Sequence, residues 1–229
     1  MLTHRMDNPV WASLSGRHAG LARRAGDALW YDQDHTPFVA VDDVNAKVVD
    51  DGALRGRRYF VGVAPTSLPD NWIQLETTKY HATPDTLQFV RPLTCPGFEP
   101  VEGVSVLGPA DWNAMSSLTA KVYPEFFRRR TPELGTYMGV IRDGELLAMA
   151  GERMALPGAV EISAVCTHPD HLGKGLAGTV MRALINRHRA AGLVSFLHVS
   201  TGNDSATRLY EKLGFELRTV LRLTAVDIV

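Results

Sequence analysis

One segment constrains the fold of this chain more than any other, because a strand-like run, Glu161 to Thr167, leads into a glycine-rich turn and then into an amphipathic helix pattern at about 175–191. The turn is His168-Pro169-Asp170-His171-Leu172-Gly173-Lys174-Gly175-Leu176-Ala177-Gly178. A strand, a glycine turn and a helix in this order point several unpaired backbone N–H groups at one spot, where they can bind phosphate. Glycines let the backbone approach an anion without an intervening Cβ. The segment therefore predicts a phosphate-bearing ligand.

Two general phosphate motifs fit this turn poorly. A P-loop needs Ser or Thr directly after its Gly-Lys to hold magnesium, but Gly175 follows Lys174. The run from Gly173 to Gly178 matches the dinucleotide fingerprint G-x-G-x-x-G literally. That fingerprint also needs an acidic residue about 20 residues further on, and Val194 to Ser200 contains none. A nicotinamide-dependent oxidoreductase is therefore a weak alternative, which an NADH-binding assay would test.

A third interpretation depends on the order of motifs in the C-terminal half. The glycine turn is followed by a predicted strand at 196–199 and then by Asn203-Asp204-Ser205-Ala206-Thr207-Arg208-Leu209-Tyr210-Glu211-Lys212-Leu213-Gly214-Phe215. The segment from about 104 to 225 resembles the GNAT superfamily of acetyl-CoA-dependent N-acetyltransferases. The family loop reads R/Q-x-x-G-x-G/A, and its later helix ends in N-x-x-A-x-x-x-Y-x-x-x-G-F. The second pattern is matched at Asn203, Ala206, Tyr210, Gly214 and Phe215, whereas the R/Q position of the first falls on Leu172.

This resemblance implies direct transfer of an acetyl group from acetyl-CoA to a primary amine. It implies that Asn203 contacts the cofactor, although asparagine is also a good N-cap for the helix that follows. Since Leu172 replaces a polar side chain, we expect cofactor binding to persist in a weaker form. The residues implied for the cofactor are Gly173, Lys174, Gly175, Leu176, Ala177 and Gly178 for the diphosphate, and Val165, Cys166 and Thr167 for the pantetheine arm.

Three residues are candidates for proton transfer. By resemblance, Tyr210 is the general acid that protonates the leaving thiolate, although it also belongs to an apolar helix stripe typical of a core. Glu161 and His198 are rival bases, because family members place a catalytic glutamate at each of these strand positions. Imidazole, with an ordinary pKa of about 6.5, suits a base at neutral pH. The alternatives are a solvated glutamate and a histidine hydrogen-bonded within the sheet.

Strand alternation gives an expectation for the surroundings of Glu161. It places Glu161, Ser163, Val165 and Thr167 on one face of their strand and Ile162, Ala164 and Cys166 on the other. We expect a cleft to wet the first face and helices to cover the second. Cys166 is accordingly expected to be a buried small residue rather than a nucleophile.

Other chemistry has little support. His168, Asp170 and His171 lie in a turn without a fourth ligand, so no metal is expected. The run Arg128-Arg129-Arg130 indicates a solvated charged loop, and the alternative is a site that attracts an acidic substrate. Cys95 and Cys166, far apart in the sequence, define no disulfide framework.

Composition limits the partners. The 229 residues carry a formal net charge of −1 and are 45% hydrophobic, which permits a packed core and gives no electrostatic case for nucleic acid. No apolar run approaches the ~18–20 residues that span a bilayer, and the first residues lack the apolar region of a signal peptide. We expect a cytoplasmic protein with a small-molecule or peptide amine as acceptor, with no nucleic-acid or membrane partner and with a homodimer left open. The alternative function is a catalytically silent acetyl-CoA sensor or regulatory module.

The predicted fold class is α/β with a mixed sheet, divided near residue 100. Residues 1–100 predict a smaller α/β region that resembles a degenerate GNAT-like half, and residues 101–229 predict the GNAT domain. In the first region we expect helices at 11–25 and 43–54 and strands at 28–31, 38–41, 59–63, 72–80 and 86–91. In the second we expect a strand at 104–107, a helix from Asp111 to about Tyr123, a hairpin of 137–142 and 145–154 around Asp143-Gly144, and strands at 160–167, 196–199 and 217–226.

Overall fold

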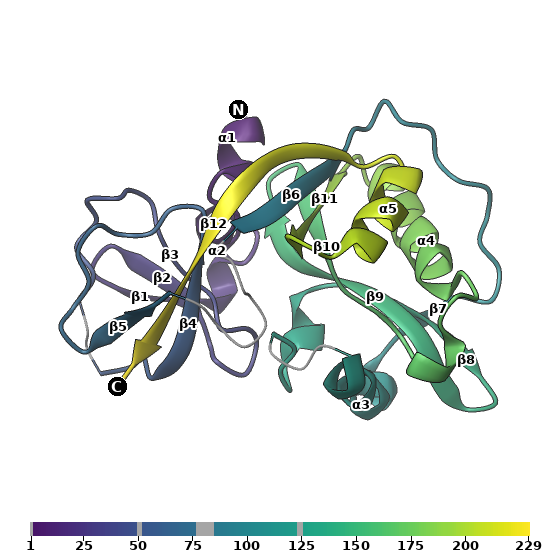
Figure 1. Ribbon diagram of the computed structural model, residues 1–229, viewed down its shortest axis with the longest axis horizontal. Coiled ribbons are helices and arrows are strands. Elements are labelled where there is room, and N and C mark those ends of the chain that lie inside the picture. Colours follow the sequence, from purple (N-terminus) through teal and green to yellow (C-terminus); the bar gives the residue numbers. More distant parts are fainter. Residues whose placement is uncertain (1, 50–51, 77–84, 123–125) are drawn as a thin grey trace.

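The computed structural model describes residues 2–49, 52–76, 85–122 and 126–229 (Figure 1). Within these ranges a nine-stranded mixed sheet has the order β4-β12-β6-β11-β10-β9-β8-β7, with β5 paired to β12. A separate three-stranded sheet has the order β1-β2-β3. The α/β fold class predicted from the sequence is confirmed.

The elements have the following bounds. The small sheet contains β1 (Ala22–Ala25), β2 (Ala28–Tyr31) and β3 (Val39–Val41). The large sheet contains β4 (Gly56–Val61), β5 (Trp72–Leu75), β6 (Asp85–Arg91), β7 (Ser105–Leu107), β8 (Tyr137–Arg142), β9 (Glu145–Leu156), β10 (Ala159–Thr167), β11 (Val194–Ser200) and β12 (Glu216–Ile228). The helices are α1 (Leu2–Met6), α2 (Pro9–Leu14), α3 (Trp112–Val122), α4 (Leu176–Ala190) and α5 (Asp204–Lys212), with short 3₁₀ turns η1 (Ala19–Leu21), η2 (Pro109–Asp111), η3 (Thr131–Leu134) and η4 (Pro169–His171).

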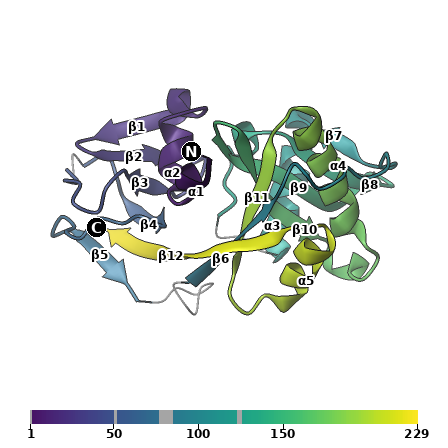
Figure 2. The same ribbon diagram turned by 90° about the horizontal axis from the view of Figure 1, so that it is seen from above.

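Strand β12 joins the two halves of the chain. Its first part, 216–222, pairs with β6, and its second part, 223–228, pairs with β4 and over 225–228 also with β5. Strand β6 lies between β12 and β11. Strands from both sides of residue 100 therefore share one sheet, and Figure 2 shows β12 and β6 running between the two lobes. The division into two domains stays a prediction, and a degenerate GNAT-like half in the N-terminal region is not confirmed.

The predicted hairpin between β8 and β9 is confirmed. Its turn residues Asp143 and Gly144 have φ angles of 50° and 79°, as a two-residue hairpin turn requires. Further along the same pair of strands, Tyr137 lies opposite Gly151. A Cβ added to Gly151 would lie 2.1 Å from the Tyr137 ring, so this cross-strand contact depends on glycine.

Some predicted N-terminal elements are wrong. No helix forms in the described part of 43–54, where Asp43 Oδ1 instead accepts a hydrogen bond from the Asn45 N–H at 2.7 Å, a local turn that competes with a helix. Ala22–Ala25, expected within a helix, forms β1 because it pairs with β2. Residues 77–80 of the strand expected at 72–80, and Tyr123 at the end of the predicted third helix, lie outside the described residues.

A buried hydrogen-bonded group connects α2 to both sheets. The Tyr31 hydroxyl donates to Ser13 Oγ at 2.8 Å, and His18 Nδ1 lies 3.1 Å from Ser13 Oγ and 2.9 Å from the Tyr31 hydroxyl. Ser13 Oγ also accepts from the backbone N–H of Ala155 in β9 at 3.0 Å. Burial lowers the pKa of His18 to about 4, so the folded chain keeps this imidazole neutral.

We expect this histidine to make folding stability depend on pH. Between the ordinary pKa of 6.5 and the folded value of about 4, the unfolded chain binds a proton that the folded chain does not. As the pH is lowered through this range, the free energy of unfolding should therefore decrease by up to about 3 kcal/mol. Below the folded pKa of about 4, this histidine should cause no further decrease. Urea unfolding at pH 7.5 and 4.5 measures the change. A His18→Gln variant with the same pH dependence as the native protein would contradict this assignment.

Among the described residues, no helix is both long and apolar enough to cross a bilayer.

Candidate active site

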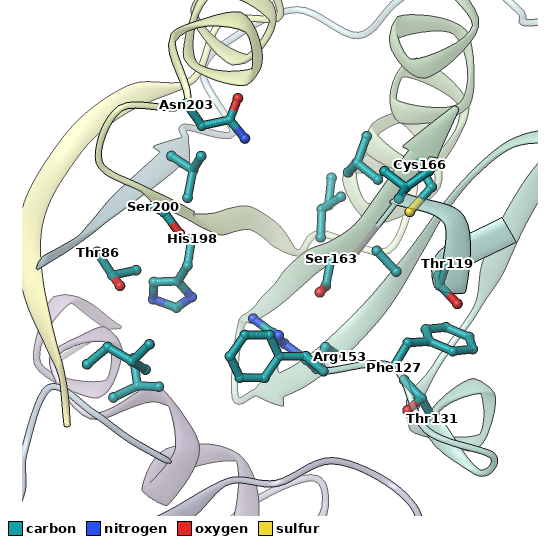
Figure 3. Close-up of a pocket in the computed structure, with 18 of the residues that line it drawn as sticks. Thr86, Thr119, Phe127, Thr131, Arg153, Ser163, Cys166, His198, Ser200 and Asn203 are labelled. Carbon is teal, nitrogen blue, oxygen red and sulfur yellow. The ribbon is translucent and has the colours of Figure 1, made fainter. Parts of the chain in front are cut away.

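The site begins where two parallel strands separate. β10 and β11 pair only over 159–161 and 194–196 in the described chain. Beyond Glu161 the strands diverge, and a cavity of about 270 Å³ lies between them. Ser163 and Cys166 of β10 lie on one side of it and His198 and Ser200 of β11 on the other (Figure 3).

An irregularity in β10 directs successive residues into this cavity. The register with β9 shifts between Ser163 and Cys166, and Ala164 has a φ of 51°, a left-handed conformation that alanine rarely adopts. Such a bulge breaks the alternation of a strand, and all four residues from 163 to 166 line the cavity. The predicted division into two faces is therefore wrong. Ile162 packs with the α4 side chains, whereas Cys166 packs with those of α3.

The predicted phosphate loop follows directly from the end of β10. Gly173 and Gly175 have φ angles of 75° and 74°, and Gly175 is the N-cap of α4. The backbone N–H groups of residues 173–178 form no hydrogen bond with the described residues. A Cβ added at Gly173 or Gly175 would meet no atom within 4 Å. The loop therefore presents free amides on an open surface.

The loop carries one cationic and one exposed apolar side chain beside its free amides, Lys174 and Leu172. Lys174 Nζ lies 3.4 Å from the Asp170 carbonyl oxygen and 3.3 Å from His171 Nδ1, which keeps its charge beside the loop. Leu172, at the position where the family pattern has a polar residue, is 66% exposed. The amides do not depend on either side chain.

Tyr210 belongs to α5, the helix that follows β11 in the chain, and its side chain borders the cavity. Its ring packs near Phe89 and Phe215, and the residue lines the cavity. The hydroxyl forms no hydrogen bond with any described residue. Burial raises the pKa of Tyr210 to about 12. At neutral pH this phenol therefore carries its proton and has it available for a bound group.

Asn203 is the N-cap of α5, as predicted. Its Oδ1 accepts a hydrogen bond from the Ala206 N–H at 3.2 Å, and the residue also lines the cavity. The side-chain amide can therefore cap the helix and lie beside a ligand at the same time.

The expectation that a cleft wets the strand face carrying Glu161 is wrong. It is wholly buried, because Arg153 of β9 covers its carboxylate with a bidentate pair, Nε to Oε2 at 2.9 Å and Nη2 to Oε1 at 2.6 Å. Burial by itself raises the pKa of a carboxyl group, but the charge of Arg153 and the hydrogen bonds from Arg153 and His198 outweigh it and lower the pKa of Glu161 to about 2. The carboxylate is thus a weak base.

His198 is held at both ring nitrogens. Nδ1 lies 2.7 Å from Glu161 Oε1, and Nε2 lies 2.9 Å from Gln88 Nε2. The Gln88 amide has a fixed orientation, because its Oε1 accepts from Arg218 at 2.6 Å and its Nε2 donates to the Met6 carbonyl at 2.9 Å. His198 Nε2 must therefore accept from Gln88, which assigns a neutral ring with its proton on Nδ1. Sequence reasoning missed Gln88 and Arg218. The signal that the sequence offers for Gln88 is a polar residue between Leu87 and Phe89 in the strand expected at 86–91.

Two aromatic rings that sequence reasoning also missed form another wall. Phe38 and Phe126 stack with centroids 5.5 Å apart and an interplanar angle of 2°. The guanidinium of Arg153 lies 4.9 Å from the Phe38 centroid and 6.0 Å from that of Phe126. Phe38 comes from the N-terminal region, so both halves of the chain build the cavity.

Among the remaining candidates, Cys166 lines the cavity, whereas His168 and the run Arg128-Arg129-Arg130 do not. His168 Nδ1 accepts from the Asp170 N–H at 3.3 Å, and no group of three His, Cys, Asp or Glu side chains in the described ranges is placed to hold a metal. Arg129 and Arg130 form ion pairs with Asp34 and Glu133. Cys166 is buried, as predicted, and burial raises its pKa to about 12, which keeps it a thiol.

Comparison with known proteins identifies the family. A family model described as FR47-like protein matches residues 137–223. A solved structure from Novosphingobium aromaticivorans DSM 12444, assigned to the GNAT family of acetyltransferases, is 32% identical, covers 99% of each chain and has a TM-score of 0.85. This chain belongs to the GNAT family. The resemblance seen in the glycine loop and in the Asn203–Phe215 motif is confirmed, and the chain is an acyltransferase of the GNAT type.

A second structure agrees at the level of the fold. A GCN5-related N-acetyltransferase from Kribbella flavida is 18% identical over 99% of this chain and 95% of its own, with a TM-score of 0.61. None of the curated proteins matches this chain. GNAT acetyltransferases use acetyl-CoA, and the free amides at 173–178 and the gap between β10 and β11 suit that ligand.

Proposed function

We propose that this GNAT enzyme transfers the acetyl group of acetyl-CoA to a primary amine by direct attack in a ternary complex. The observation that carries the proposal is the gap between β10 and β11, which is lined by Tyr210 and Asn203 and leads along β10 into the loop of free amides. One extended ligand can place a diphosphate on the loop and a thioester in the cavity. An acceptor can reach the thioester from the aromatic wall.

The donor site follows from unpaired backbone groups. Gly173, Lys174, Gly175, Leu176, Ala177 and Gly178 would bind the diphosphate through their N–H groups, helped by the positive end of the α4 dipole. Val165, Cys166 and Thr167 lie where β10 no longer pairs with β11, so their backbone can bind the pantetheine arm as an added strand. Asn203 would contact the same arm. Acetyl-CoA would supply the acetyl group.

Proton transfer is assigned to the buried polar residues. His198 would accept the proton of the amine at Nε2, with Glu161 holding Nδ1–H, once the acceptor replaces the Gln88 contact. Tyr210 would donate a hydrogen bond to the leaving sulfur. Complete transfer from a phenol with a pKa of about 12 to a thiolate whose conjugate acid has a pKa of about 8.5 is uphill by about 5 kcal/mol. A hydrogen bond that strengthens as charge develops is the role that fits Tyr210.

Tyr210→Phe tests this role. Loss of a hydrogen bond to a developing charge should lower kcat by about 10- to 100-fold and change the KM for acetyl-CoA little. Thiol release at saturating acetyl-CoA measures it. Tyr137→Phe is the matched control, because the Tyr137 hydroxyl is buried without a partner among the described residues. Equal kcat for Tyr210→Phe and the native enzyme would remove Tyr210 from the mechanism.

The second candidate function is a silent acetyl-CoA sensor. It is favoured by the contact of His198 Nε2 with Gln88 and by Leu172 in place of a polar residue. Titration calorimetry with acetyl-CoA, combined with thiol release over a panel of amines, separates the two functions. Binding without thiol release from any amine supports the sensor.

A further inference from the structure

One buried hydroxyl group in the cavity wall is available to a ligand. Three threonines among the described residues line the cavity, Thr86, Thr119 and Thr131. Thr119 Oγ1 donates to the Met115 carbonyl oxygen at 2.9 Å, and Thr131 Oγ1 donates to the His35 carbonyl oxygen at 2.5 Å. Thr86 is 6% exposed, and its Oγ1 has no hydrogen-bond partner within the described parts of the chain. The protein therefore satisfies two of these hydroxyls and leaves the third to the cavity.

Thr86 also differs from the other buried groups of this kind. Elsewhere in the described ranges, the buried polar side-chain atoms that lack a hydrogen bond belong to residues that do not line the cavity. An unpaired buried hydroxyl destabilises a folded protein, and buried polar groups are therefore nearly always paired. In the wall of a ligand cavity, such a hydroxyl indicates a polar group of the ligand that pairs with it.

Strand pairing places Thr86 near the proposed base. Thr86 of β6 lies opposite Ser200 of β11, and Gln88 lies opposite His198, so His198 is the diagonal neighbour of Thr86 on one face of the sheet. Figure 3 shows the Thr86 and His198 side chains on the same side of the cavity, across from Ser163. Neighbouring strands are about 4.8 Å apart. An amine bound at His198 and an oxygen bound at Thr86 are therefore separated by about one strand spacing, which two or three carbons span.

The surroundings of Thr86 make its hydroxyl selective. Its neighbour on β12 is Leu221, and Phe38, Val61 and Leu223 line the same cavity. A wholly apolar acceptor body would displace water from the hydroxyl and return no hydrogen bond, whereas an oxygen at that point would keep it paired. Because a threonine hydroxyl both donates and accepts, a hydroxyl or a carbonyl oxygen suits it.

We propose, on the basis of the function proposed above, that Thr86 determines which amines are acetylated. The acceptor carries a neutral oxygen, in a hydroxyl or a carbonyl group, on the second or third carbon from its primary amine. Thr86 Oγ1 forms a hydrogen bond with this oxygen and so orients the amine toward His198 and the thioester. Amino alcohols and amino amides belong to this class of acceptor, and simple alkylamines do not.

Matched pairs of amines test the proposal. The oxygen series is 2-aminoethanol, 3-aminopropan-1-ol and 3-aminopropanamide, and the carbon series of similar shape is propylamine, butylamine and 3-methylbutylamine. Thiol release with saturating acetyl-CoA at pH 7.5 gives kcat/KM for each amine. The ratio of kcat/KM for an oxygen amine to that for its carbon analogue should fall by about 10-fold from the native enzyme to Thr86→Val. Comparing this ratio between variants cancels differences in amine basicity and in the folded fraction of enzyme.

Two control variants isolate the hydroxyl of Thr86. Thr86→Ser keeps the hydroxyl and should keep most of the native ratio. Thr119→Val removes a hydroxyl that lines the same cavity but is already bonded to Met115, and should leave the ratio unchanged.

The outcomes separate this inference from the proposed function. An equal ratio in Thr86→Val and the native enzyme overturns the inference, and so does thiol release from other amines of the panel but from none of the oxygen series. In both cases the acetyltransferase function stands. If calorimetry shows bound acetyl-CoA and no amine of the panel or of either series releases thiol, the proposed function and this inference fail together.

Discussion

Glu161→Gln is expected to lower the free energy of unfolding by about 3–5 kcal/mol. The substitution keeps the shape of the side chain and removes the charge that Arg153 pairs with through two hydrogen bonds. It leaves a guanidinium that is 12% exposed without the Glu161 carboxylate, so the two charge-assisted hydrogen bonds of this pair no longer offset the desolvation of the cation. Urea unfolding followed by circular dichroism at pH 7 measures the loss.

Two controls separate this effect from a general cost of removing an ion pair. Asp34→Asn removes the partner of Arg129 in a pair whose side chains are 50% and 76% exposed, and should cost less than about 1 kcal/mol. The double variant Arg153→Met with Glu161→Leu replaces the buried pair by apolar side chains and should be more stable than Glu161→Gln alone. If Glu161→Gln lowered the free energy of unfolding no more than Asp34→Asn does, the Arg153–Glu161 pair would not be what stabilises this part of the core.

The ion pair also predicts a response to acid. Because the pKa of Glu161 falls from 4.5 to about 2 in the folded chain, its contribution to stability is present above the unfolded pKa. That contribution is lost as the pH falls through the folded value. The loss from Glu161 therefore lies below pH 4.5, and the loss from His18 lies mainly above that pH, so a pH series distinguishes them.

Features set by neighbours in the sequence were predictable. The Asp143-Gly144 hairpin, the glycine loop before α4 and the Asn203 cap of α5 depend on backbone conformations that these residues favour locally. The partner of each strand is not a local property. Alternation in Thr86 to Arg91 predicted a strand but not its place between β11 and β12, and nothing in the sequence of 216–228 indicates that β12 pairs with both halves.

In the candidate site, too, the residues that come from one continuous segment were predictable and those from distant segments were not. Loop glycines, Asn203 and Tyr210 come from one continuous region, and the structure places Tyr210 and Asn203 at one cavity. The surroundings of Glu161 were not predictable, because the bulge at Ala164 has no signature in the run Ser163-Ala164-Val165. Phe38 and Gln88 come from strands and loops more than 70 residues away from Glu161 in the sequence. Their place beside the site is a consequence of the shared sheet.

Gly175→Asp is expected to weaken acetyl-CoA binding by at least about 100-fold. Gly175 is the left-handed N-cap of α4, with a φ of 74°, and lies among the free amides proposed to bind the diphosphate. A carboxylate at this position repels a diphosphate through a like-charge interaction of a few kcal/mol at about 4 Å. Titration calorimetry of the variant with acetyl-CoA measures the change in Kd.

The fold should survive this substitution, which makes a loss of binding interpretable. Aspartate is a favourable N-cap and tolerates the left-handed region better than most residues, and a Cβ at Gly175 meets no atom within 4 Å. Gly175→Asn has nearly the same shape without the charge and should bind acetyl-CoA more tightly than Gly175→Asp by about tenfold or more. Equal Kd values for the two variants would mean that no anion lies against this turn, and a native Kd in Gly175→Asp would place the diphosphate elsewhere on the molecule.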